Sequence, residues 1–209
     1  MQPNPHPMGF HFRRIPTMTV TEAIRSRRTI FKFKPDPVPL ADLERILSYG
    51  IWAPNHHNTE PWRFTIIGDQ TKETLAQRYR EIQIEKALAN NDQLTEDQKE
   101  KIGGAGYHKF MSKPTIAAVS CRQEGDEQRQ REDYAATCCA IQNIQLVAWE
   151  TGVGIQWSTG TITLESETYR LLGADPENEY MVGFLYTGYP ELTPKPNRKP
   201  FENFLRLTR

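Results

Sequence analysis

The stretch at residues 134–149 reads YAATCCAIQNIQLVAW and predicts a long, buried helix. Its polar members are Thr137, Gln142, Asn143 and Gln145, so the helix is apolar around most of its circumference. A helix that is apolar on nearly every side must be buried on nearly every side. A chain of 209 residues can hardly enclose such a helix alone. We therefore expect a second copy of the chain to cover part of it, most simply in a two-fold symmetric homodimer.

Segments whose composition is typical of β-strands precede and follow this helix in the sequence. Apolar runs rich in β-branched and aromatic residues predict strands at 62–67, 115–121 and 180–189. The run at 115–121 is almost continuously apolar, so we expect it to be buried on both faces. Residues 29–34 are predicted to be extended, and three prolines end that segment.

Four further helices are predicted from capping boxes and apolar stripes. They cover residues 19–28, 40–52, 71–110 (with a break near Asn90) and 165–172. Strands separated by helices indicate an α/β or α+β sandwich, with helices packed on a central sheet.

The remaining segments are expected to be exposed or mobile. Residues 1–17 hold four prolines and predict a flexible N-terminal extension, which leaves 18–209 as the folded domain. Residues 103–106 read GGAG and predict a loosely ordered cover, and the charged run 124–133 predicts a solvated segment. The proline-rich tail at 194–201 predicts an extended arm.

Composition excludes several classes of function. Lys and Arg number 26, as do Asp and Glu, and this balance argues against a general nucleic-acid binder. No apolar run approaches the roughly 20 residues that span a membrane, so we expect no membrane partner. The three cysteines form no disulfide framework, and no signal peptide is evident, which favours the cytoplasm. His56 and His57 are neighbours without a third ligand at suitable spacing, so no metal site is predicted.

No catalytic motif made of protein groups stands out, which favours chemistry on a cofactor. The basic cluster around Arg27 and Arg28 is either a solvated helix end or a phosphate clamp. With Arg198 it would hold the phosphate of a flat aromatic cofactor. Hydrogen-bond donors and an aromatic wall would come from Thr29, Trp157, Ser158 and Thr159.

The order of five sequence blocks resembles the nitroreductase family, and the resemblance covers residues 18–206. The blocks are RRTIFKFKPDPVP at 27–39, APNHHNTEPWRF at 53–64, GVGIQWSTG at 152–160, VGFLYTG at 182–188 and PNRKPFE at 196–202. The resemblance implies an α+β nitroreductase-like fold: a mostly antiparallel sheet packed with helices, a long helix at the dimer interface and an extended C-terminal arm.

The resemblance also implies a homodimer with FMN at the subunit interface and NADH or NADPH as hydride donor. One subunit would contact FMN through Arg27, Arg28, Thr29, Trp157, Ser158, Thr159 and Arg198. The partner would contribute Trp52, His56 and Asn58. The nicotinamide nucleotide would lie near Val147, Ala148, Trp149, Glu150, Thr151 and Gly152.

The implied reaction is ping-pong transfer of hydride through flavin N5 to nitroaromatic or quinone-like acceptors, with no catalytic protein group. Two departures from the family stand out. Phe31 replaces a basic residue, so reduced FMN is expected to be less stabilised, and Lys32 is a doubtful substitute. Glu60 replaces a glutamine and would repel an anionic substrate.

The alternatives to a nitroreductase reaction are dehalogenation or flavin-destroying chemistry on the same fold, a flavin-storage module without turnover, and a dimeric interaction protein with an empty slot.

Overall fold

The computed structural model describes residues 18–208, and the predicted extension at 1–17 lies outside these described residues. The α-helices are α1 (Val20–Ser26), α2 (Leu40–Ser48), α3 (Asp69–Asn90), α4 (Glu96–Met111), α5 (Glu127–Glu150) and α6 (Ser166–Leu172). The strands are β1 (Trp62–Ile66), β2 (Thr115–Arg122), β3 (Gly154–Ser158) and β4 (Glu179–Gly188). Short 3-10 turns are η1 (Tyr49–Trp52), η2 (His56–Asn58), η3 (Thr161–Leu164) and η4 (Phe201–Asn203).

The four strands form one antiparallel sheet in the order β1-β2-β4-β3. The three strands predicted from the sequence are confirmed to within one residue at most ends. The fourth, β3, was missed, because it is only five residues long and its half-buried Gln156 interrupts the apolar run. It lies at the edge of the sheet, next to the segment that carries Thr29.

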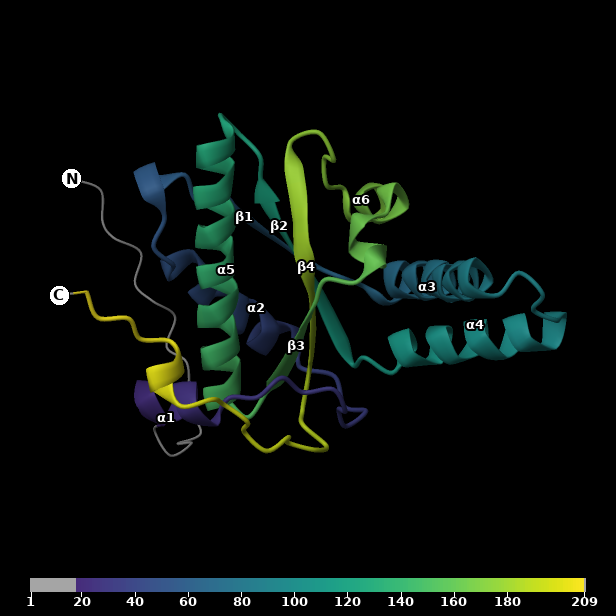
Figure 1. Ribbon diagram of the computed structural model, residues 1–209, viewed down its shortest axis with the longest axis horizontal. Coiled ribbons are helices and arrows are strands. Elements are labelled where there is room, and N and C mark those ends of the chain that lie inside the picture. Colours follow the sequence, from purple (N-terminus) through teal and green to yellow (C-terminus); the bar gives the residue numbers. More distant parts are fainter. Residues whose placement is uncertain (1–17, 209) are drawn as a thin grey trace.

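Helices cover both faces of the sheet (Figure 1). Strand β2 supplies alternate side chains to two cores: Ala117 and Val119 face α2 and α5, whereas Ile116 and Ala118 face α3, α4 and α6. Its residues from 116 to 121 are all buried, which confirms a strand enclosed on both faces. The α+β class and the antiparallel sheet are therefore confirmed.

Helix α5 is the long helix expected from the sequence, but it begins earlier than expected. Asp126 caps it by accepting a hydrogen bond from the Arg129 backbone N–H (2.9 Å), so most of the charged run forms its first two turns. Within the single chain, one face of the helix stays uncovered. Tyr134, Cys139 and Gln142 are exposed there, although the opposite face is fully buried.

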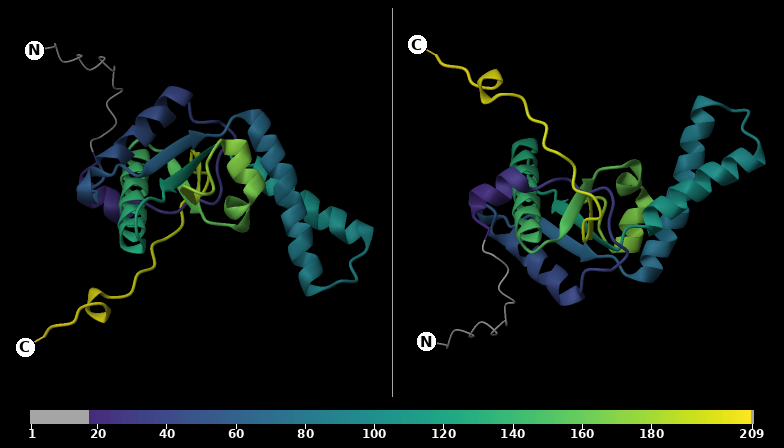
Figure 2. Two further views of the ribbon diagram at one scale, coloured as in Figure 1. Left: turned by 90° about the horizontal axis from the view of Figure 1, so that it is seen from above. Right: turned by 90° about the horizontal axis from the view of Figure 1, so that it is seen from below.

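Helices α3 and α4 form a hairpin that projects from the body of the molecule (Figures 1 and 2). The predicted break after Asn90 and the Thr95 capping box are confirmed. The expectation of a loose cover at residues 103–106 is wrong, since these residues lie inside α4. Gly103 and Gly106 instead let the two helices approach: a Cβ on Gly103 would lie 2.7 Å from Cγ of Arg80.

Adjacent glycines of α4 should respond oppositely to alanine. Gly104→Ala should raise the free energy of unfolding by about 0.5–1 kcal/mol, because alanine restricts the unfolded chain and nothing lies within 4 Å of its new Cβ. Gly103→Ala should lower it by about 1–3 kcal/mol through overpacking against α3. Urea titrations of the two variants measure both effects, and equal responses would contradict the close packing.

The C-terminal segment after β4 extends away from the sheet, as expected for an arm (Figure 2). It exposes large apolar side chains that its own chain leaves uncovered: Leu192, Phe201, Phe204, Leu205 and Leu207. Among residues 18–208, no helix combines the length and apolar character that crossing a membrane requires.

Candidate functional site

Arg27 and Arg28 follow α1 beside the C-terminal half of α5, and Arg198 of the C-terminal arm lies near enough for its charge to act on Arg27. Arg27 lies at the C-cap of α1 and donates a hydrogen bond from Nη1 to Oε1 of Gln145 (3.2 Å). Burial lowers the pKa of Arg27, and the nearby charges of Arg198 and Arg28 lower it further. None of the ion pairs found among residues 18–208 involves these three side chains. Such a concentration of cations favours the binding of an anion.

Arg28 has a buried donor without an acceptor in the described structure. Its Nη1 donates to the carbonyl oxygens of Arg25 and Arg27, both at 2.7 Å, which fixes the guanidinium beside the helix end. Its Nε is buried and makes no hydrogen bond to any residue between 18 and 208. An unsatisfied buried donor costs about 1–3 kcal/mol. An oxygen of a bound phosphate would satisfy this N–H, so the cluster fits a phosphate-bearing ligand.

The arginines adjoin an open edge of the sheet. Thr29 forms a parallel bridge with Ile155, and the backbone N–H of Ile30 donates to the Ile155 carbonyl (3.2 Å). Backbone groups alternate in direction along a strand, so Trp157, two residues further on, directs its N–H and C=O toward the same open side. Its indole N–H donates to the Val182 carbonyl (3.1 Å), which fixes the ring against β4.

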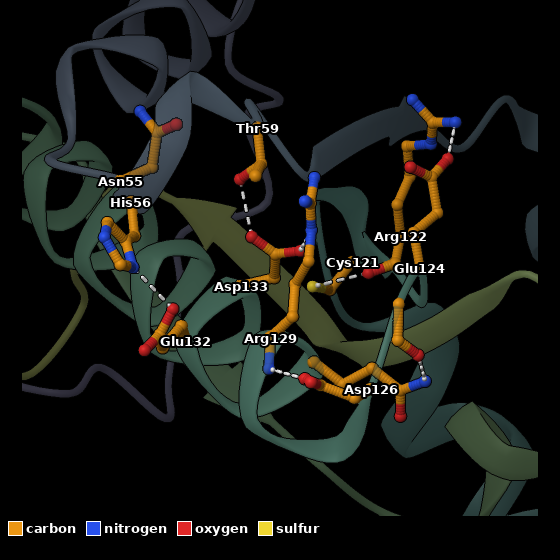
Figure 3. A network of polar contacts seen from close by, with 12 residues as sticks. Asn55, His56, Thr59, Cys121, Arg122, Glu124, Asp126, Arg129, Glu132 and Asp133 are labelled. Carbon is orange, nitrogen blue, oxygen red and sulfur yellow. Dashed lines mark hydrogen bonds and ion pairs between the residues drawn. The ribbon is translucent and has the colours of Figure 1, made fainter.

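The loop after η1 lies near the other end of α5. Nδ1 of His56 lies 2.7 Å from Oε2 of Glu132, and the hydroxyl of Thr59 donates to Oδ1 of Asp133 at 2.5 Å (Figure 3). His56 donates to the Glu132 carboxylate and thereby lowers its pKa, as Gln128 also does. A hollow of about 360 Å³ lies between this loop and the first turns of α5.

The backbone of this loop is strained. His57, Asn58 and Glu60 all have positive φ, at 56°, 52° and 44°, a region that non-glycine residues rarely adopt. The contacts to Glu132 and Asp133 hold the loop in this conformation, together with a hydrogen bond from the Glu60 N–H to Asn55 (3.0 Å). Strain of this kind is concentrated at functional sites.

The predicted cofactor residues thus form two groups within one chain. The first holds Arg27, Arg28, Thr29, Trp157, Ser158, Thr159 and Arg198. The second holds Trp52, His56 and Asn58, all exposed. Arg27 is anchored at Gln145 of α5 and His56 at Glu132, which are 13 residues apart, or about 20 Å along the helix. Trp52 lies between these anchors, because Gly50 of the same turn packs against Ile144. Within one chain, the loop that carries His56 and Asn58 therefore lies away from Arg27, which is the arrangement expected if this loop serves a different copy of the site.

Residues 147–152, the predicted nicotinamide-nucleotide segment, form the end of α5 and its cap. The indole N–H of Trp149 donates to the hydroxyl of Ser26 (2.9 Å), and Gly152 has a φ of 79° at the turn into β3. These contacts tie the helix end to α1 next to Arg27. The nucleotide-binding role of the segment stays a prediction.

Several residues that organise the site carry no recognisable signal in the sequence. Glu132 and Asp133 lay in a run interpreted as solvated, yet Asp133 is only 3% exposed. From the sequence, Gln145 is simply one of the polar positions on an apolar helix, although in the structure it positions Arg27. Among residues 18–208, no group of three or more potential metal ligands is found.

Comparisons with known proteins agree with this architecture. The model of the Nitroreductase family matches residues 24–189. "Putative NAD(P)H nitroreductase YfhC" of Bacillus subtilis (strain 168) is 32% identical over 179 residues, which cover 85% of this chain and 88% of that protein. The crystal structure of a nitroreductase-like family protein from Bacillus cereus has a TM-score of 0.76 at 27% identity and covers 93% of this chain and 98% of its own. A protein from Desulfovibrio desulfuricans described as a "putative nitroreductase", crystallised with FMN, shares the fold, with a TM-score of 0.68 at 23% identity over 94% of this chain and 98% of its own.

Proposed function

Because the chain belongs to the nitroreductase family of oxidoreductases, we propose that it is an FMN-dependent enzyme that works as a homodimer. It takes hydride from NADH or NADPH and passes it to a nitroaromatic or quinone-like acceptor. The observation that carries this proposal is that Arg27 and Arg28 adjoin Thr29, which bridges to β3 at Ile155, and that the buried Arg28 Nε–H has no acceptor among residues 18–208.

The residues of the first group suit the two ends of FMN. Arg27, Arg28 and Arg198 would hold the ribityl phosphate, because guanidinium groups bind phosphate oxygens through paired hydrogen bonds. The flavin ring would lie along the open edge of β3, where the fixed indole of Trp157 and the backbone groups of this strand would orient it. When bound, FMN supplies the hydride chemistry, which explains why the chain needs no nucleophile or acid–base pair of its own.

A second copy of the chain would complete the site. The uncovered face of α5 and the exposed apolar residues of α1, η1 and the arm supply a surface for it: Val20, Ile24, Ile51, Trp52, Phe201 and Phe204. In a two-fold dimer, Trp52, His56 and Asn58 of each subunit would reach the FMN of the other and exclude water from the ring. The position of the loop that carries His56 and Asn58, near the opposite end of α5, supports this sharing.

We propose the cytoplasm as the location of the protein. The three cysteines are free thiols, of which Cys121 is buried and Cys139 is exposed. A reducing compartment preserves such thiols.

Anaerobic spectroscopy of the purified protein tests the proposed reaction. The protein should be yellow, or turn yellow with added FMN, and NADH or NADPH should bleach it. A nitroarene or a quinone should then restore the colour. Flavin that stays oxidised in the presence of both nucleotides would support the storage module instead. A preparation that takes up no FMN would contradict the proposal.

Glu60 should select against anionic acceptors. Its carboxylate is exposed on the strained loop, and no ion pair among residues 18–208 neutralises it. Glu60→Gln should raise kcat/KM for 4-nitrobenzoate about 3- to 10-fold and leave kcat/KM for its neutral methyl ester nearly unchanged. The substitution removes the repulsion between the Glu60 carboxylate and the carboxylate of the substrate, which solvent partly screens. An equal change for both substrates would contradict a charge effect.

A further inference from the structure

Lys113 is a buried cation that the proposed function leaves without a role. It lies between α4 and β2 and is only 6% exposed. Its Nζ donates to the Phe31 carbonyl oxygen (3.2 Å) and to Oε1 of Gln156 (3.3 Å). The ammonium also lies over the rings of Phe33 and Tyr186, at 5.4 Å and 5.2 Å from their centroids. All these partners are neutral.

The charged groups around Lys113 make its burial more costly. Burial lowers its pKa, and the charge of Lys109 lowers it further. Lys72, another cation, donates to the Lys113 carbonyl oxygen (2.5 Å). No carboxylate pairs with Lys113 among residues 18–208. A buried charge without a counter-ion is costly, so its presence calls for an anion that arrives with a ligand.

The two hydrogen-bond partners of Lys113 belong to the two segments that border the proposed flavin site. Phe31 lies two residues after Thr29, and Gln156 directly precedes Trp157. The segments contact each other at Ile155 and then diverge, since the carbonyl of Lys32 accepts from the Glu191 N–H instead of pairing with β3. The ammonium lies between the diverging segments. A small cavity of about 70 Å³ beside it is also lined by Ser158.

We propose that Lys113 supplies the positive charge that stabilises the reduced flavin in this protein. The inference rests on the proposed function and deepens it. The side chain at position 31 is a phenyl group with 60% exposure, and Lys32 is exposed to solvent, where its charge is screened. Lys113 acts from behind the site, through the Phe31 peptide and across a dry interior where charges interact more strongly than in water. It is therefore a positioning and electrostatic residue rather than a catalytic one.

The midpoint potential of bound FMN in the holoenzyme tests this inference. Lys113→Gln keeps an N–H donor for the Phe31 carbonyl but removes the charge. It should weaken binding of reduced FMN relative to oxidised FMN about tenfold, which lowers a two-electron potential by about 30 mV. Lys113→Arg keeps the charge and should keep most of the potential. Lys109→Gln and Lys32→Gln remove exposed cations near the same place and should change the potential much less.

Each outcome decides the inference. A native potential in a Lys113→Gln protein that holds its full complement of FMN would overturn it and leave the proposed function intact. If the potential falls as much in Lys109→Gln as in Lys113→Gln, the inference is also overturned, because the effect would then reflect the total positive charge near the site and not Lys113 itself. If Lys113→Gln does not fold, Lys113→Met, which fills a similar volume without charge, takes its place, and failure of both to fold would make the lysine structural. A parent protein whose FMN is not reduced by NADH or NADPH would refute the proposed function, and one that binds no FMN would overturn both.

Discussion

Replacing Arg28 by alanine should weaken FMN binding about 10- to 100-fold while leaving the chain folded. One charge-assisted hydrogen bond to phosphate contributes about 1.5–3 kcal/mol, and Arg28 offers a buried Nε that has no other acceptor in the described structure. Among residues 18–208, its Nη1 bonds only to carbonyls at the end of α1, so the substitution removes no side-chain hydrogen bond between distant elements. Arg198→Ala should act in the same direction from the C-terminal arm.

Titration of the apoprotein with FMN, followed by quenching of flavin fluorescence, measures the effect. Arg25→Ala is the matched control, because Arg25 is an exposed arginine in the last turn of the same helix. It should change the Kd of FMN less than about threefold, as expected for a screened surface charge. Unchanged FMN affinity in both Arg28→Ala and Arg198→Ala would remove the phosphate clamp from this account.

Gly183→Ala should destabilise the protein by about 3 kcal/mol or more and loosen the flavin site with it. Gly183 has a φ of 149° in β4, which side chains of L-residues rarely adopt. A Cβ there would lie 2.6 Å from the Ser158 carbonyl oxygen and 2.6 Å from Nε1 of Trp157. Backbone strain and overpacking each cost about 1–3 kcal/mol, and here they add.

Urea unfolding gives the free energy, and FMN content of the folded fraction gives the effect on the site. Gly104→Ala is the control, since its new Cβ meets nothing within 4 Å. A Gly183→Ala variant whose free energy of unfolding lies within about 0.5 kcal/mol of the parent value, with normal FMN content, would show that β3 and Trp157 can shift freely. The rigid edge of the sheet would then not orient the flavin.

Local patterns of the sequence predicted most elements of the fold. The capping boxes at Thr19 and Thr95 fix helix starts through hydrogen bonds within four residues, and such signals survive any tertiary context. Long apolar runs identified β2 and β4. The GGAG run led to a wrong prediction of flexibility, because glycine also allows two helices to pack closely. Only the three-dimensional contact of α4 with Arg80 on α3 distinguishes the two roles.

The site was less predictable, because its supporting contacts join distant residues. The resemblance to a family identified the arginines, but not that Gln145 holds Arg27 or that Glu132 holds His56. Those pairs are separated by more than 70 residues, and each anchor looks like an ordinary polar residue of a helix. Lys113 gave no signal either: its burial depends on how α4, β2 and residue 31 meet in three dimensions.

The central claim is that FMN lies between two copies of the chain, held by the arginines of one and covered by the loop of the other. Sedimentation velocity of the FMN-saturated protein, followed at protein and flavin wavelengths together, tests it most directly. We expect a single species of twice the chain mass that carries all bound flavin, one FMN per chain. Flavin that sediments with a single chain, or a dimer that carries none, would contradict the claim.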